Sequence, residues 1–101
     1  MTSSVEATDA ASKAVQKTPN RISLDYLKSR ILTKQFINPE IQPTMTLCLV
    51  QHVNGFIVIG KAAPADPANF NALLGRQFAE EDAIRQLWPL EAFALLERGF
   101  A

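Results

Sequence analysis

The stretch that most constrains the fold of this chain is Asn54-Gly55, which joins two apolar runs rich in β-branched residues. Asn and Gly both tolerate the positive φ angles that a two-residue type I′ turn requires. The pattern therefore predicts a tight antiparallel β-hairpin, with strands at about 44–53 and 56–63. A two-residue turn would also fix the register of the two strands. The expected pairs are Val53 with Phe56, His52 with Ile57, Gln51 with Val58, and Val50 with Ile59.

Both faces of this hairpin are apolar. One face is expected to carry Leu47, Leu49, Val53, Phe56 and Val58, and the other Cys48, Val50, Ile57 and Ile59. A hairpin with one side in water normally alternates apolar and polar residues. We therefore expect both faces to be covered, by helices or by a second copy of the chain.

Composition sets outer limits on size and function. A chain of 101 residues is long enough for one domain. Ten basic and ten acidic residues cancel, so no bulk charge favours nucleic acid or an anionic membrane. The longest apolar run, residues 47–59, is too short and too interrupted to span a bilayer. With one cysteine and one histidine, we expect no metal site within one chain and no other cofactor.

The N-terminal part divides into an arm and a helix. Residues 1–20 hold few large side chains, which predicts a flexible N-terminal arm or a frayed helix before a single α+β domain over residues 21–101. Ser23 is typical of a helix N-cap. The apolar stripe of this helix is expected to include Leu24, Leu27 and Ile31. We expect the helix to end near Lys34 or Gln35.

Two helices are predicted after the hairpin. Asp66 suits an N-cap and Pro67 suits the first helical position, so a long helix is expected over about 67–87. Pro89 should end it and start a short C-terminal helix over about 89–98. The large apolar side chains of the long helix fall on one broad face and are Phe70, Leu73, Leu74, Phe78, Ile84, Leu87 and Trp88.

The opposite face of the long helix is a stripe of small residues. Its members are Ala68, Ala72, Gly75, Ala79 and Ala83. Alanine is a good helix former, so the stripe can reflect helix propensity alone. Gly75 favours a close contact instead, because glycine in a helix costs about 1 kcal/mol relative to alanine. A helix–helix contact, within or between chains, and simple helix propensity both remain open. The predicted fold class is α+β, with an N-terminal helix, a two-stranded hairpin and two further helices, assembling as an oligomer.

No catalytic constellation is visible in the sequence, and we expect the protein not to be an enzyme. Cys48 and His52 fall on one strand, about 13 Å apart at strand spacing, which is too far for a nucleophile and its base. The four glycines are scattered at positions 55, 60, 75 and 99, so they form no phosphate-binding loop.

Some side chains are compatible with ligand binding and also have plainer interpretations. Arg85 can meet a phosphate at the rim of the apolar face, or form an ordinary pair with Glu81 one turn before it. Phe56 and Trp88 can stack on a base, although aromatic residues beside Leu and Ile are more often core residues.

An ordered set of motifs then resembles a known family over most of residues 19–97. The motifs are Asn54-Gly55-Phe56, Asp66-Pro67-Ala68-Asn69-Phe70, Gly75-Arg76 and Trp88-Pro89-Leu90. They resemble a family of small phage proteins named after gene products of coliphage N4 and Shigella phage Sf6. The resemblance implies a viral protein of a bacteriophage or prophage, made in the host bacterial cytoplasm.

Members of this family are similar to the first class of Thoeris anti-defence proteins. Those proteins act as sponges: they bind cyclic ADP-ribose signals made by bacterial TIR enzymes, and in some cases cyclic di- or trinucleotides, without cleaving them. They form dimers or larger homo-oligomers with the ligand between chains. The resemblance thus implies a cyclic nucleotide as partner, while the balanced charge leads us to expect no nucleic acid or membrane partner.

The resemblance also implies site residues. Phe56 and Asn69 are expected to stack on and hydrogen-bond a nucleotide, and Arg76 or Arg85 to hold its phosphate. The alternative function is that of a small oligomeric phage accessory protein, acting by protein–protein contact without a small-molecule ligand.

Overall fold

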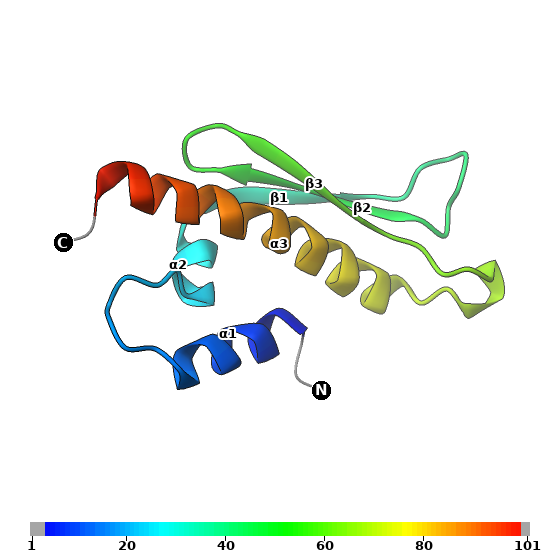
Figure 1. The fold of residues 1–101 in the computed structure, drawn as a ribbon. Coiled ribbons are helices and arrows are strands. Elements are labelled where there is room, and N and C mark those ends of the chain that lie inside the picture. Colours follow the sequence, from blue (N-terminus) through cyan, green and yellow to red (C-terminus); the bar gives the residue numbers. More distant parts are fainter. Residues whose placement is uncertain (1–3, 100–101) are drawn as a thin grey trace.

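The computed structural model describes residues 4–99 and has an α+β fold. The ends of the predicted arm and domain, residues 1–3 and 100–101, lie outside the described residues. Three antiparallel strands form one sheet in the order β1-β2-β3. Helix α3 crosses one face of this sheet and lies between the sheet and α1 (Figure 1). The elements are α1 (Ser4–Ala14), α2 (Leu24–Ser29), β1 (Ile31–Ile37), β2 (Thr46–His52), β3 (Ile57–Ala62), the 3-10 turn η1 (Pro67–Asn69) and α3 (Ala72–Arg98).

The predicted hairpin is present, but its loop has three residues and its register differs by one. The His52 N–H donates to Phe56 O at 2.8 Å, and the Gly55 N–H donates to His52 O at 2.8 Å. Gly55 has a φ of 95°, whereas Asn54 does not have a positive φ, so the type I′ turn is wrong. The observed pairs include Gln51 with Ile57, Val50 with Val58, and Leu49 with Ile59.

The changed register reassigns the faces of β3, because a slip of one residue turns every side chain over. Val58 is buried under α3, while Ile57 and Ile59 are half-exposed on the outer face. Within one chain, α3 therefore covers a single face of the hairpin. Its coverage on the other face by a second copy stays a prediction.

The sheet contains a third strand where the sequence predicted the end of a helix. The N-cap at Ser23 is confirmed, since its Oγ accepts the Tyr26 N–H at 3.0 Å. Helix α2 nevertheless ends at Ser29, and residues 31–37 form β1 instead of continuing to Lys34 or Gln35. Tertiary contacts explain the difference. Residues 31–37 are rich in side chains that suit a strand, and by pairing with β2 they cover an edge that would otherwise be unpaired.

The C-terminal part forms one helix and not two. Asp66 caps only the short turn η1, and α3 begins after Asn71, whose Oδ1 accepts the Leu74 N–H at 3.0 Å. The helix then passes through Pro89 and ends before Gly99. A proline in a helix removes one N–H donor, and the buried side chains of Leu87 and Glu91 on either side of it hold the two halves in one helix.

Three members of the small stripe, Gly75, Ala79 and Ala83, pack on the sheet, whereas Ala72 is exposed. A Cβ atom at Gly60 of β3 would lie 2.0 Å from Ala79 O and 2.5 Å from Ala83 N. Likewise, a Cβ at Gly75 would lie 2.7 Å from the Thr46 hydroxyl. The helix backbone therefore lies directly against the sheet, and this close packing explains the small stripe. Part of the predicted large apolar face points outward instead; Leu73 is 77 % exposed.

Gly60→Ala should destabilise the protein by about 3 kcal/mol or more, because the added methyl group meets helix backbone that cannot move alone. Urea unfolding followed by circular dichroism would measure this change. Lys61→Ala, on the exposed side of the same strand, is the control and should alter stability by less than about 0.5 kcal/mol. A wild-type midpoint for Gly60→Ala would contradict the close contact.

The N-terminal segment contains a helix, α1, that contacts α3 and α2. Val5 is buried in the core. Asp9 Oδ1 accepts the Leu24 N–H at 2.9 Å and a guanidinium N–H of Arg21 at 2.7 Å. These two hydrogen bonds, first the backbone one, lower the pKa of Asp9 below its ordinary value of 3.8. Flexibility of residues 1–20 in solution stays a prediction.

Asp9→Asn should reduce the free energy of unfolding by about 1–2 kcal/mol near neutral pH. Because the folded-state pKa of Asp9 is depressed, its contribution is fully present above about pH 4 and is lost as the pH falls through the folded-state value. The difference between wild type and variant should therefore be constant from pH 5 to 8 and shrink towards pH 3. Chemical unfolding at each pH tests this, and a difference independent of pH would contradict it.

Candidate functional site

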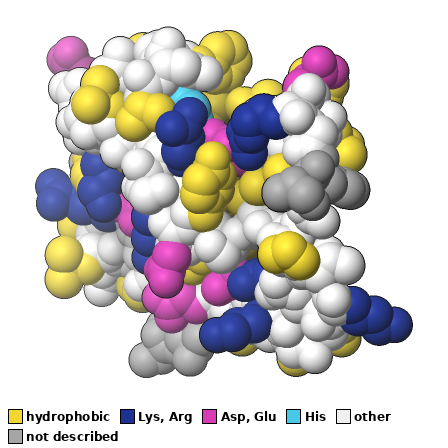
Figure 2. All heavy atoms as spheres, turned by 90° about the vertical axis from the view of Figure 1, so that its left-hand side faces the viewer, with side chains coloured by type: hydrophobic (Ala, Val, Ile, Leu, Met, Phe, Trp, Pro, Cys, Tyr) yellow, Lys and Arg dark blue, Asp and Glu magenta, His cyan; other side chains and the backbone are white. Residues whose placement is uncertain are grey.

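A pocket of about 250 Å³ lies where the β2–β3 loop meets the C-terminal half of α3; we call it the hairpin pocket. Its polar lining comes from separate parts of the chain: Arg30 after α2, His52 and Asn54 at the hairpin, and Glu91 and Arg98 on α3. Phe56 stands at its rim, and its apolar wall is formed by Leu87, Leu90 and Ala94. Figure 2 shows this face, with the histidine and acidic side chains between basic ones in a hollow edged by hydrophobic side chains.

A buried pair, His52 and Glu91, forms the floor of the hairpin pocket. Their exposed fractions are 6 % and 3 %, and His52 Nε2 contacts Glu91 Oε1. The other ring nitrogen, Nδ1, accepts the Asn54 N–H at 3.1 Å. A nitrogen that accepts a hydrogen bond carries no proton, so the ring is the neutral tautomer that donates from Nε2 to Glu91. Both ring nitrogens are thus engaged within the protein.

Glu91 also orients Arg30. Arg30 Nε lies 3.5 Å from Glu91 Oε1, and the Arg30 side chain is 38 % exposed. Arg30 Nε and Glu91 Oε2 are both buried and have no hydrogen-bond partner among the described residues. No terminal nitrogen of Arg30 makes a hydrogen bond within residues 4–99 either, so the outer edge of the guanidinium is available to an anion.

The charges in the hairpin pocket give it a positive balance. Arg30 and Arg98 contribute two positive charges and Glu91 one negative charge, while His52 is neutral. Arginine pairs suit phosphate and carboxylate groups, and an exposed aromatic ring at the rim suits the face of a base. Chemically, the pocket can hold a small anion that also carries a flat ring.

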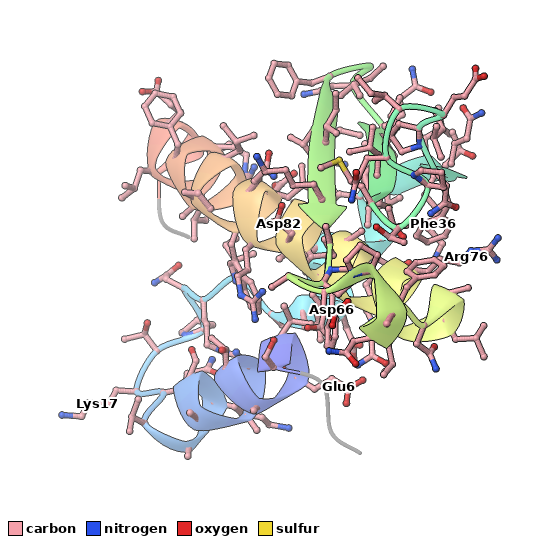
Figure 3. The ribbon with its side chains drawn as sticks, turned by 90° about the vertical axis from the view of Figure 1, so that its right-hand side faces the viewer. Glu6, Lys17, Phe36, Asp66, Arg76 and Asp82 are labelled. Atoms are coloured by element: carbon pink, nitrogen blue, oxygen red, sulfur yellow. The ribbon has the colours of Figure 1, made fainter. Side chains whose placement is uncertain are left out.

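The structure disperses the four site residues predicted from sequence within one chain. Phe56 lies in the hairpin pocket. Asn69 lines a second, more apolar pocket of about 290 Å³ beside η1. Arg76 lies over the Phe36 ring, 5.5 Å from its centroid, at the other end of the molecule (Figure 3). Arg85 donates to the Ser4 hydroxyl. One chain alone therefore brings none of these four together.

The structure shows the contacts of Arg85 and Trp88, for which the sequence left two interpretations open. In the described part of the chain, Arg85 and Glu81 form no direct ion pair. Ser4 lies between them: its hydroxyl accepts from Arg85 and donates to Glu81 Oε2 at 2.8 Å. Trp88 packs against the core, and its indole N–H donates to Ile22 O at 2.8 Å, which fits the plain core interpretation.

Sequence reasoning missed Arg30, His52, Glu91 and Arg98 as a group. His52 is buried, because the strand register turns it toward α3. One signal was available: Glu91 follows Leu87 by four residues, so it lies on the buried stripe of a continuous helix. Pro89 obscured that signal by suggesting a new helix start just before Glu91.

Other chemistry is limited in the described part of the chain. Residues 4–99 contain no cluster of three or more His, Cys, Asp or Glu side chains that could hold a metal ion. Burial, reinforced by the charge of Glu80, raises the pKa of the Cys48 thiol to about 11, so this thiol is a poor nucleophile at neutral pH. No helix among these residues has the length and apolar character needed to cross a membrane.

Comparison with known proteins gives one match. The model of the phage protein family of N4 Gp49 and phage Sf6 gene 66 matches residues 13–98, which include the sheet, α3 and every residue of the hairpin pocket. No curated protein and no solved structure matches the chain.

Proposed function

The chain belongs to the phage protein family of N4 Gp49 and phage Sf6 gene 66, and we propose that it binds and sequesters a cyclic nucleotide immune signal of the bacterial host without cleaving it. The observation that carries this proposal is the hairpin pocket, with two arginines, an exposed aromatic ring and a buried His–Glu pair. Cyclic ADP-ribose isomers and cyclic dinucleotides are the candidate ligands.

The phosphate and the base of a nucleotide each have a complement in this pocket. A phosphate can accept from the outer nitrogens of Arg30 and from Arg98, and charge-assisted hydrogen bonds of this type are strong. A base can lie on the half-exposed ring of Phe56, where stacking is worth about 1–3 kcal/mol. The combination favours a nucleotide over a simple inorganic anion.

The state of His52 supports binding without hydrolysis. A general base needs a free nitrogen within reach of a water molecule. In His52, Nδ1 accepts from Asn54 and Nε2 donates to Glu91, so neither nitrogen is free to take a proton. A ligand held here would meet recognition groups and no free nitrogen of His52.

The size of the pocket supports a role for a second copy. Its volume of about 250 Å³ lies below the roughly 300–1,000 Å³ of typical small-molecule sites. One chain would therefore enclose about one nucleotide unit, and a larger cyclic ligand would extend beyond it. Arg76 or Arg85 of another copy could then reach the same ligand, as the family resemblance implies.

The purified protein should gain thermal stability with cyclic ADP-ribose isomers or cyclic dinucleotides, and heat should release the ligand intact.

Phe56→Ala and Arg98→Ala should each weaken binding about tenfold or more, measured by titration calorimetry. Arg76→Ala and Arg85→Ala are matched controls: unchanged affinity places the site within one chain, and lost affinity places it between copies. No stabilisation and no recovered ligand would overturn the proposal.

A second function, that of an oligomeric accessory protein acting by protein contact, is favoured by the outer face of the sheet. Ile37, Ile57 and Ile59 are exposed there beside the partly buried Leu47 and Leu49. Residues paired directly across strands point to the same side, so these apolar side chains lie together on one face, which also carries Gln35, Gln51 and Lys61. A second copy presents the same surface and could cover it.

Wild-type protein should then form homo-oligomers at micromolar concentration, with a melting temperature that falls on dilution. Ile59→Glu should give a monomer in light scattering, because it places a charge in the apolar surface. Leu73→Glu, which changes an exposed residue on α3, is the matched control and should leave the assembly intact. A wild-type monomer at every concentration would contradict self-association through this face.

A further inference from the structure

We propose that Glu91 makes the hairpin pocket selective for phosphodiesters, which carry one negative charge, over terminal phosphates, which carry two. This inference rests on the proposed function and specifies which phosphate chemistry the same site prefers. It assigns Glu91 the role of a positioning and specificity residue that acts through Arg30 and His52.

The floor of the hairpin pocket carries the buried carboxylate of Glu91. Glu91 is 3 % exposed and contacts His52 through Oε1, while its Oε2 has no partner among the described residues. A buried carboxylate is costly unless cations and hydrogen-bond donors compensate it. Because His52 is in the neutral form, its donor supplies a hydrogen bond and no charge, so Arg30 is the cation that balances Glu91.

That balance leaves one unit of positive charge for a ligand. Among the residues that line the pocket, Arg30, Arg98 and Glu91 are charged, and they sum to +1. A phosphodiester brings −1 and neutralises the site. A terminal phosphate loses its second proton near pH 6 and brings about −2 at pH 7.5, so one negative charge would face the Glu91 carboxylate uncompensated.

Glu91 also has a second effect, because it positions the guanidinium of Arg30. Arg30 Nε lies 3.5 Å from Glu91 Oε1 and is buried, so the guanidinium can present only its outer edge to the pocket. A single phosphate group meets this edge together with Arg98. The pocket thus selects a cyclic over a linear nucleotide by the charge around the phosphate. This selection needs no contact with the base.

The test uses adenosine 3′,5′-cyclic monophosphate and adenosine 5′-monophosphate, which share base and sugar and differ in phosphate charge. Titration calorimetry at pH 7.5 gives the ratio of the two affinities. Wild type should favour the cyclic form. Glu91→Gln raises the pocket charge to +2 and should shift the ratio about three- to tenfold toward the 5′-monophosphate. Glutamine keeps an oxygen to accept from His52, which favours retention of the fold.

Arg98→Gln is the opposing variant and lies at the pocket mouth, away from the core. It lowers the pocket charge to zero and should weaken both nucleotides, with the larger loss for the 5′-monophosphate. The two variants therefore move the affinity ratio in opposite directions. A purely structural effect would change both affinities by the same factor. Melting temperatures confirm that each variant is folded. If Glu91→Gln does not fold, Arg98→Gln still tests whether the pocket charge sets the ratio, and an unchanged ratio overturns the charge argument.

The outcomes separate this inference from the proposed function. Wild-type binding with a ratio unaffected by either variant overturns the role of Glu91 and leaves nucleotide binding in place. Binding of neither nucleotide overturns the single-chain phosphate site. The separate measurements with cyclic ADP-ribose isomers and cyclic dinucleotides would then decide whether the proposed function is correct.

Discussion

The close approach of α3 to β3 at Gly60 is the contact on which the rest of the structure depends. Ala79 and Ala83 are fully buried against this glycine, and no larger residue would fit between the two backbones. Because the helix lies so near the strand, its side chains reach the strand edge: Asp82 Oδ2 accepts the Lys61 N–H at 2.9 Å, and Gln86 Nε2 donates to Ile59 O at 2.7 Å. These two groups at the edge of β3 are therefore not available to pair with another strand.

The same contact positions the candidate site. Along the helix, the residues that face the sheet become larger toward the C-terminus, from Ala79 and Ala83 to Leu87 and Glu91. Glu91 therefore comes under the end of β2, where its carboxylate meets His52. The space left between the hairpin loop and the last turns of the helix is the hairpin pocket. The pocket is thus a geometric consequence of close packing at one end of α3 and wider spacing at the other.

Sequence alone predicted the hairpin, the α+β class and the helical character of residues 72–98, because each has a strong local signal. The sequence-based prediction was wrong where two local backbone structures suit the same residues about equally well. Asn54-Gly55 suits a two-residue or a three-residue loop, and packing chooses between them by placing Val58 and Gly60 against α3. A glycine within a strand and a small stripe on a helix, considered together, predict this packing and with it the register. The strand β1 was missed because its partner edge on β2 is visible only in three dimensions.

The candidate site was harder to predict than the fold, since its polar residues come from separate parts of the chain and each has an ordinary interpretation alone. Glu91 is the informative member. A leucine at this position would continue the buried stripe begun by Leu87 and would need no partner, and replacing a buried charge by an apolar residue is often neutral or stabilising. A carboxylate here instead requires the His52 donor and the Arg30 cation, and it fixes the orientation of that arginine. Stability does not require this arrangement, and the anion site that we propose would use it to hold one guanidinium in place and limit the net charge of the pocket.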